Sequence, residues 1–313
     1  MRAAVIDIGS NSTRLLIADA DAARGTVAEV LRRSQVTRLG AGLEATGELS
    51  QAGIERVEVV LASYRRAMLE HGADANLSVL TEAVRRATNG AAFAQRVRDH
   101  YQLNAQVLTG DQEALLTFLG ATFQGRDAGR AASREPTVVI DIGGASTEFV
   151  VGRGTSAGFH VSLPVGVVRL SERRIAHDPP TGAEVKAIAR DVRSTFGAGL
   201  PPRERAPVRE GVAVAGTATS AAAIDQGLEP YDPERVHGYR LSLQTVEELI
   251  GRTAAMTEAQ RRTVTGLEPG RAPTIVAGLI ILREALSAFA LQGVTVSEHD
   301  ILFGGVLQLA GMN

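Results

Sequence analysis

Several features that the sequence lacks exclude particular kinds of chemistry and of segment. The 313 residues include no cysteine, which excludes disulfides, thiolate nucleophiles and cysteine-ligated metals. The longest apolar stretch, residues 272–282, is too short to cross a bilayer, so no membrane segment is expected. The first residues enter a strand-like segment directly and show none of the features of a signal peptide, which favours a cytoplasmic location.

Basic charge comes almost entirely from arginine, since Lys186 is the one lysine among 33 Lys and Arg residues. A lysine-dependent phosphate loop is therefore not expected, whereas arginine can hold phosphate oxygens bidentately. The net charge of −2 gives no general attraction to nucleic acid or membrane surfaces, so neither is an expected partner. An anionic substrate would have to be bound by a local group of arginines.

An internal duplication is the strongest pattern present. Residues 4–13 read AVIDIGSNST and residues 138–147 read VVIDIGGAST, and the two segments align without a gap. Each copy continues into a second strand-like stretch. The duplication predicts two related domains, each containing a strand–turn–strand unit.

Strand-like and helix-like segments alternate along the rest of the chain, which indicates an α/β protein. Apolar residues recur at helical spacing in residues 51–71, and further helices are expected at 184–196, 245–256 and 274–291. Strands are expected at residues 77–80, 105–108, 159–163, 212–215 and 294–296. The proline-rich segment 197–210 is typical of a loop.

Each copy of the duplication places an aspartate at the end of an apolar strand and follows it with glycine and hydroxyl side chains. Small residues let backbone N–H groups approach phosphate oxygens, and a carboxylate can bind Mg²⁺. A single copy would suit an ordinary turn equally well. Two copies that both keep the aspartate favour a phosphate and metal site.

These two segments, Asp7–Ser12 and Asp141–Glu148, resemble the phosphate-binding motifs of the exopolyphosphatase/guanosine-pentaphosphate phosphatase family. Residues 81–89, 108–114, 211–217 and 266–271 resemble four further family segments in the same order. The resemblance implies the duplicated actin-like, ribonuclease-H-like α/β fold that acetate and sugar kinases share, with an interdomain cleft. The expected domains are residues 1–122, joined by a C-terminal helix at 300–313, and residues 123–299.

The resemblance also implies which residues form the site. Glu113 matches the catalytic glutamate that activates water, and Asp111 is placed to cap the helix that follows. A divalent cation, expected to be Mg²⁺, would be held by Asp7, Asp141 and Glu148. The residues expected to bind the phosphates of the substrate are Ser10, Asn11, Ser12, Arg14, Arg85, Gly143, Gly144, Ser146, Gly216, Thr217 and Arg271.

Two of these segments raise a question of geometry. Ala145 stands where the family usually has a third glycine, and alanine disfavours a positive φ. Arg271 follows Pro269 and Gly270, which predicts a mobile loop that brings the arginine onto the substrate.

The expected function is release of terminal orthophosphate from inorganic polyphosphate. Short chains are expected to be preferred because the chain ends without the family's extra C-terminal domain. Two alternatives remain open: a guanosine pentaphosphate 5′-phosphatase, and a weakly active sensor or binding protein for phosphate-rich metabolites. A kinase is disfavoured because residues 81–89 and 108–114 resemble the phosphatase branch. A homodimer is compatible with the sequence.

Overall fold

The computed structural model describes residues 1–123 and 135–312. Contacts divide the chain into two units, Met1–Ala132 with Ile301–Asn313 and Ser133–Asp300. The domain boundaries expected from the sequence, after residues 122 and 299, lie within ten residues of these. The second unit is thus inserted between two segments of the first. No helix in the described ranges is both long and apolar enough to cross a membrane.

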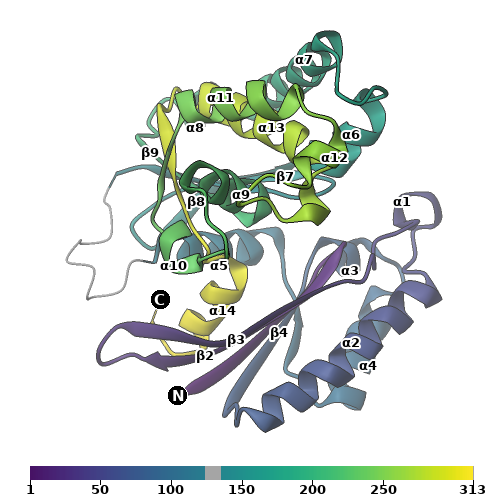
Figure 1. Cartoon of the computed structure of the whole chain (residues 1–313). Coiled ribbons are helices and arrows are strands. Elements are labelled where there is room, and N and C mark those ends of the chain that lie inside the picture. Colours follow the sequence, from purple (N-terminus) through teal and green to yellow (C-terminus); the bar gives the residue numbers. More distant parts are fainter. Residues whose placement is uncertain (124–134, 313) are drawn as a thin grey trace. The chain divides into compact units, whose positions relative to one another are not determined.

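The first unit is built on a five-stranded mixed sheet in the order β3-β2-β1-β4-β5 (Figure 1). Strands β1, β2 and β3 are antiparallel, whereas β4 and β5 run parallel to β1. The described elements of this unit are β1 Arg2–Ile8, β2 Ser12–Asp21, β3 Thr26–Val36, α1 Leu43–Thr46, α2 Gln51–Glu70, β4 Ala75–Leu80, α3 Glu82–Arg86, α4 Gly90–Tyr101, β5 Ala105–Val107, α5 Gly110–Thr122 and α14 Ile301–Leu309.

Both faces of this sheet are covered, because successive side chains of a strand point to opposite faces. Ala4, Ile6 and Ile8 of β1 pack with apolar residues of α2 and α4. Ala3 and Val5 pack on the other side with residues of α5 and α14. The helix closest to the C-terminus therefore completes the core of the first unit.

The second unit contains a six-stranded mixed sheet in the order β10-β11-β9-β6-β7-β8. Its core joins the strands to α7, α9, α11 and α13, and α13 is buried along most of its length. The described elements are β6 Thr137–Ile142, β7 Thr147–Arg153, β8 Ser156–Leu163, α6 Val167–Arg174, α7 Gly182–Gly199, α8 Pro202–Arg205, β9 Glu210–Val214, α9 Ala215–Gln226, α10 Pro233–Val236, β10 Arg240–Ser242, α11 Leu243–Ala254, α12 Glu258–Arg261, the 3₁₀ turn η2 Pro269–Arg271, α13 Ile275–Ala288 and β11 Gly293–Val296.

The two sheets repeat one topology, which confirms the predicted duplication. Strands β8-β7-β6 form an antiparallel meander like β3-β2-β1, and β9 and β11 continue it in parallel as β4 and β5 do. The helix predicted at residues 51–71 is α2, and the helices predicted at 184–196, 245–256 and 274–291 are α7, α11 and α13. The segment predicted to be a loop at 197–210 contains the one-turn helix α8.

Candidate active site

The first duplicated motif forms the turn between β1 and β2. The backbone N–H of Gly9 donates to the carbonyl oxygen of Ser12 at 3.0 Å, which closes the turn. The carbonyl oxygens of Ser10 and Asn11 accept backbone N–H groups from the segment after β3, Gly40 to Ser10 at 2.8 Å among them. The turn is therefore fixed, and the side chains of Ser10 and Asn11 are exposed.

The second motif forms the same turn between β6 and β7. The N–H of Gly143 donates to the carbonyl oxygen of Ser146 at 2.9 Å, as Gly9 does to its counterpart. Ala145 is not among the described non-glycine residues with a positive φ, so alanine is compatible with this turn.

The second turn is also held from behind by the first turn of α6. The N–H groups of Val167 and Val168 donate to the carbonyl oxygens of Gly143 and Gly144 at 3.0 and 2.9 Å. A Cβ at Gly166 would lie 2.3 Å from the carbonyl carbon of Ala145, a distance at which atoms clash. A glycine at position 166 is thus required for this close approach. Gly166 was not among the predicted site residues, and only its place in the Pro-Val-Gly segment after β8 could have indicated it.

The two hairpins differ in the charge opposite the aspartate. In the first, Asp7 pairs across the strands with Arg14, and the two side chains form a salt bridge of 2.6 Å. In the second, Asp141 is directly opposite Glu148. Cross-strand partners of this kind share one face of the sheet, with Cβ atoms about 5 Å apart. The first hairpin therefore pairs an aspartate with an arginine across the strands, and the second pairs an aspartate with a glutamate.

The carboxylate pair of the second hairpin fits a hard divalent cation. Within the described residues, no three acidic or histidine side chains come together as a metal cage. Mg²⁺ does not require such a cage, because it commonly binds one or two carboxylates, substrate phosphates and water. Asp141 and Glu148 could offer two such oxygen ligands from one hairpin, and Oε1 of Glu148 also accepts a hydrogen bond from Ser162 at 2.6 Å. In the first unit, Asp7 is engaged by Arg14.

Glu113 lies in the first turn of α5, at the end of the sheet where β4 and β5 finish. The helix begins at Gly110, and Thr109 caps it by accepting the N–H of Gln112. The prediction that Asp111 caps this helix is wrong, because the helix starts one residue before it. Thr109 and Gln112 form a capping box, and their spacing in the sequence could have indicated this start.

The Glu113 carboxylate is held by Arg85. Nη1 of Arg85 donates to Oε2 of Glu113 at 3.0 Å and to the carbonyl oxygen of Leu108 at 2.7 Å. Burial raises the pKa of Glu113 above its usual value, and the Arg85 contact opposes this only in part. The negative charges of Asp7 and Glu82 raise the pKa further, so Asp7 and Glu113 lie within electrostatic reach of each other. The first unit thus gathers the Glu113 carboxylate, its arginine partner and the first turn at the carboxyl ends of its parallel strands.

The segment at residues 81–89 divides into two roles. Arg85 contacts Glu113, whereas the closing Asn89 makes two hydrogen bonds of 2.9 Å with the backbone of Leu49. Asn89 therefore secures the loop before α2.

Arg271 lies against the first turn of α9. Its Nε donates to Glu268 at 3.0 Å, and its Nη1 would be 1.4 Å from a Cβ placed on Gly216. The neighbouring Thr217 is buried, and its hydroxyl is directed at Gly278 of α13. Gly216 and Thr217 were both predicted to bind phosphate. In the structure Gly216 lies next to Arg271, whereas the Thr217 side chain is buried in the core.

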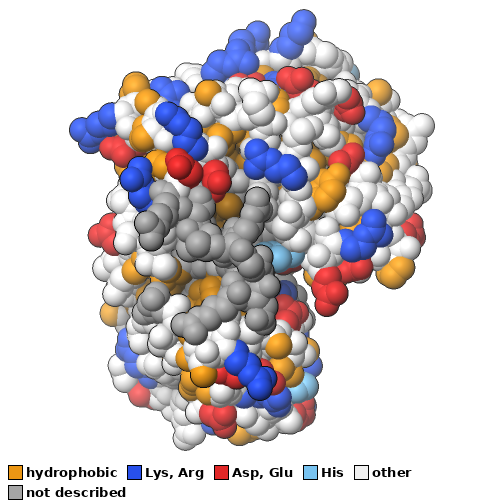
Figure 2. All heavy atoms as spheres, turned by 90° about the vertical axis from the view of Figure 1, so that its left-hand side faces the viewer, with side chains coloured by type: hydrophobic (Ala, Val, Ile, Leu, Met, Phe, Trp, Pro, Cys, Tyr) orange, Lys and Arg blue, Asp and Glu red, His pale blue; other side chains and the backbone are white. Residues whose placement is uncertain are grey.

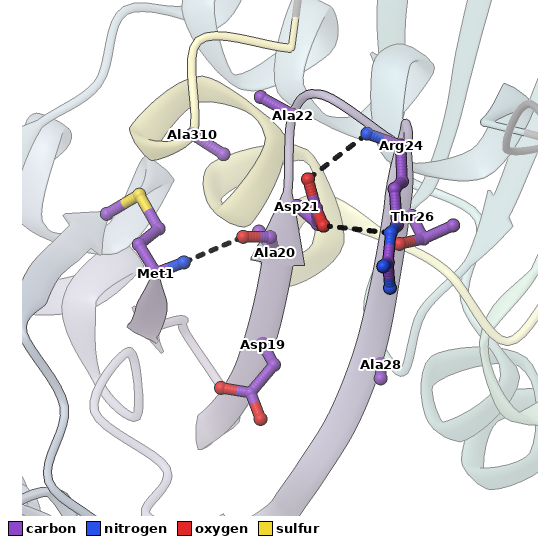
Figure 3. Close-up of a pocket in the computed structure, with 9 residues that line it drawn as sticks. All are labelled: Met1, Asp19, Ala20, Asp21, Ala22, Arg24, Thr26, Ala28 and Ala310. Atoms are coloured by element: carbon purple, nitrogen blue, oxygen red, sulfur yellow. Dashed lines mark hydrogen bonds and ion pairs between the residues drawn. The ribbon is translucent and has the colours of Figure 1, made fainter.

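On the face shown in Figure 2, basic and acidic side chains are interspersed and form no single basic patch. A depression of about 530 Å³ in the first unit is lined by Met1, Asp19, Asp21, Arg24 and their neighbours (Figure 3). It lies where β1 begins, at the opposite end of that strand from the Gly9 turn.

Comparisons with known proteins agree with this geometry. The family model of the Ppx/GppA phosphatase family matches residues 16–308. Exopolyphosphatase 2 of Mycobacterium tuberculosis is 37% identical over 321 residues, which cover 99% of this chain and 99% of that protein. The crystal structure of the Aquifex aeolicus Ppx/GppA family member superimposes with a TM-score of 0.86 at 32% identity, covering 99% of this chain and 97% of that one. This match confirms the predicted two-domain actin-like fold. The chain therefore belongs to the Ppx/GppA phosphatase family of hydrolases.

Proposed function

We propose that this chain is an exopolyphosphatase that hydrolyses the terminal phosphoanhydride bond of short inorganic polyphosphates in the presence of Mg²⁺. The observation that carries the proposal is Glu113, a carboxylate whose pKa is raised and which Arg85 holds at the carboxyl ends of the parallel strands β4 and β5. Ligands of open α/β sheets bind at this end of the strands.

Glu113 acts as the general base. It accepts one proton from a water molecule while the water oxygen bonds to the terminal phosphorus and the bridging P–O bond breaks. The bridging oxygen leaves with the shortened polyphosphate, and the released product is orthophosphate. A carboxylate with a raised pKa is a stronger base than an ordinary glutamate.

The two turns and the arginines hold the phosphates. Ser10 and Asn11 in the first unit, and Ser146 with the backbone of its turn in the second, donate to phosphate oxygens. Asp141 and Glu148 would hold Mg²⁺, which would supply positive charge to offset that of the phosphoryl oxygens. Arg271 adds a planar pair of donors.

The balance of charge supports a short substrate. Arg14, Arg85 and Arg271 each already contact a carboxylate, namely Asp7, Glu113 and Glu268. These arginines therefore add little net positive charge, and a long polyanion needs many cations along its length. Support for inorganic polyphosphate also comes from the name of the 37% identical relative, Exopolyphosphatase 2.

One assay tests the proposal. Orthophosphate release is measured side by side from polyphosphates of several lengths and from guanosine pentaphosphate, with Mg²⁺ and with excess chelator. We expect the highest kcat/KM for short polyphosphates and no turnover in chelator. A kcat/KM for guanosine pentaphosphate at least about tenfold above that of every polyphosphate, a difference of about 1.4 kcal/mol, would assign the 5′-phosphatase activity instead.

A further inference from the structure

Arg271 lies in the segment 269–272, whose first and last residues accept hydrogen bonds from Arg262 and Arg261. Nε of Arg261 donates to the carbonyl oxygen of Ala272 at 2.9 Å, and Nη1 of Arg262 donates to that of Pro269 at 3.2 Å. These two carbonyl groups bracket Gly270 and Arg271. Two adjacent arginines, Arg261 and Arg262, would be expected at the surface from the sequence, but Arg261 is only 3% exposed. The segment therefore does not match the mobile loop that its proline and glycine predict.

The guanidinium of Arg271 is fixed as well. Glu268 binds its Nε, and its Nη1 and Cζ lie where a Cβ of residue 216 would be, 1.4 and 2.1 Å from that position. Gly216 has no positive φ and lies in the first turn of α9, so its backbone does not demand glycine. Glycine is needed at position 216 because the guanidinium of Arg271 occupies the space where a Cβ would lie.

We propose that Gly216 and Arg262 are positioning residues for Arg271. Gly216 leaves the space in which the guanidinium lies, and Arg262 fixes the backbone from which it extends. Both hold the arginine in its substrate-binding position before the substrate arrives, so that little conformational entropy is lost on binding. The inference rests on the proposed function, because it assumes that Arg271 contacts the phosphates.

The inference makes an unusual prediction for Gly216→Ala. Alanine is a better helix former than glycine, and the atoms that its Cβ would displace belong to the partly exposed Arg271 side chain and not to the backbone. The thermal midpoint should therefore be equal to or above that of the wild type. Displacement of Arg271 should at the same time raise KM for tripolyphosphate and lower kcat/KM by ~10–100-fold, the usual effect of losing a hydrogen bond to a charged group.

A double-mutant cycle separates positioning from direct contact. Gly216→Ala should lower kcat/KM in the wild type but have less than about a twofold effect in the Arg271→Ala background, because coupled residues are not additive. Gly251→Ala is the matched control, since it lies on α11 with open space beside its Cα, and it should leave KM unchanged. Independent losses that multiply in the double mutant, or a Gly216→Ala enzyme with wild-type kinetics, overturn the inference.

Arg262 provides a second test that does not depend on the helix. Arg262→Ala removes the hydrogen bond to Pro269 and should raise KM with little change in kcat, and Arg262→Lys should restore part of the loss. Exposed Arg252 on α11 is the control for loss of surface charge. Equal KM values for Arg262→Ala and Arg252→Ala would refute the role of Arg262. A wild-type enzyme that releases no phosphate from tripolyphosphate would refute the proposed function instead.

Discussion

Replacing Glu113 by glutamine tests the proposed base directly. Glutamine keeps the size of the side chain and an oxygen that can accept the hydrogen bond from Arg85, but it cannot accept a proton from water. Loss of a general base costs ~10²–10⁴ in rate, or about 3–5 kcal/mol of transition-state stabilisation. We expect kcat to fall by this factor while KM for tripolyphosphate changes by less than about threefold, because the interaction belongs to the chemical step.

The same substitution should not destabilise the fold at neutral pH. The folded state raises the pKa of Glu113, so it favours the protonated, neutral form. Stability from this group is therefore fully present below its ordinary pKa of 4.5 and is lost as the pH rises through the raised value. Glutamine resembles the neutral form at every pH. The midpoint of Glu113→Gln should thus equal or exceed that of the wild type at pH 7, and the difference should shrink toward pH 4.

Two measurements decide the matter. Initial rates of phosphate release give kcat and KM, and thermal unfolding monitored by circular dichroism at several pH values gives stability. Glu70→Gln, at an exposed position on α2, is the control for loss of a carboxylate. A kcat for Glu113→Gln within about threefold of the wild type would refute the role of Glu113, because general bases contribute far more than that. A variant less stable than wild type at pH 7 would contradict the sign of the pKa shift.

Three further predictions concern the surrounding residues. Asp141→Asn should abolish phosphate release and weaken Mg²⁺ binding in isothermal titration, and unchanged Mg²⁺ affinity would contradict the carboxylate pair as its site. Arg85→Met should move the acidic limb of the kcat/KM profile to higher pH, because Arg85 lowers the pKa of Glu113; a limb that stays in place would mean that the two charges do not interact in the enzyme. Arg271→Ala should raise KM for tripolyphosphate by ~10–100-fold with an unchanged melting temperature, since its side chain is partly exposed and a charged hydrogen bond is lost. A KM equal to that of the wild type would return Arg271 to the ordinary surface charges.

The two hairpins and the helix α2 could be predicted from the sequence because each depends on a local pattern of residues. Asp7 and Asp141 lie in a repeated string, and a gapless alignment of the two copies requires equivalent hairpins. The helix α2 was predictable because it buries one face only. By contrast, α9 is rich in small residues and buried along most of its length, so it shows no amphipathic period.

Contacts between distant segments could not be predicted in this way. The alignment of the repeat places Arg14 opposite Asp7 and Glu148 opposite Asp141, but the consequence for charge appears only once the strands are paired. Arg261 and Arg262 look alike in the sequence, and only packing shows that one is buried. The pairing of Gly216 with Arg271 joins residues from a helix and a later turn, and no local pattern encodes it.

The place of α14 has a consequence for synthesis on the ribosome. This helix packs on β1 and α5, yet roughly 180 residues separate it from the end of α5. At ~5–20 residues per second, the ribosome needs on the order of 10–40 s to supply it. During that time the sheet face formed by Ala3, Val5 and Val79 lacks part of its cover. We therefore expect the nascent first unit to expose an apolar surface that chaperones recognise.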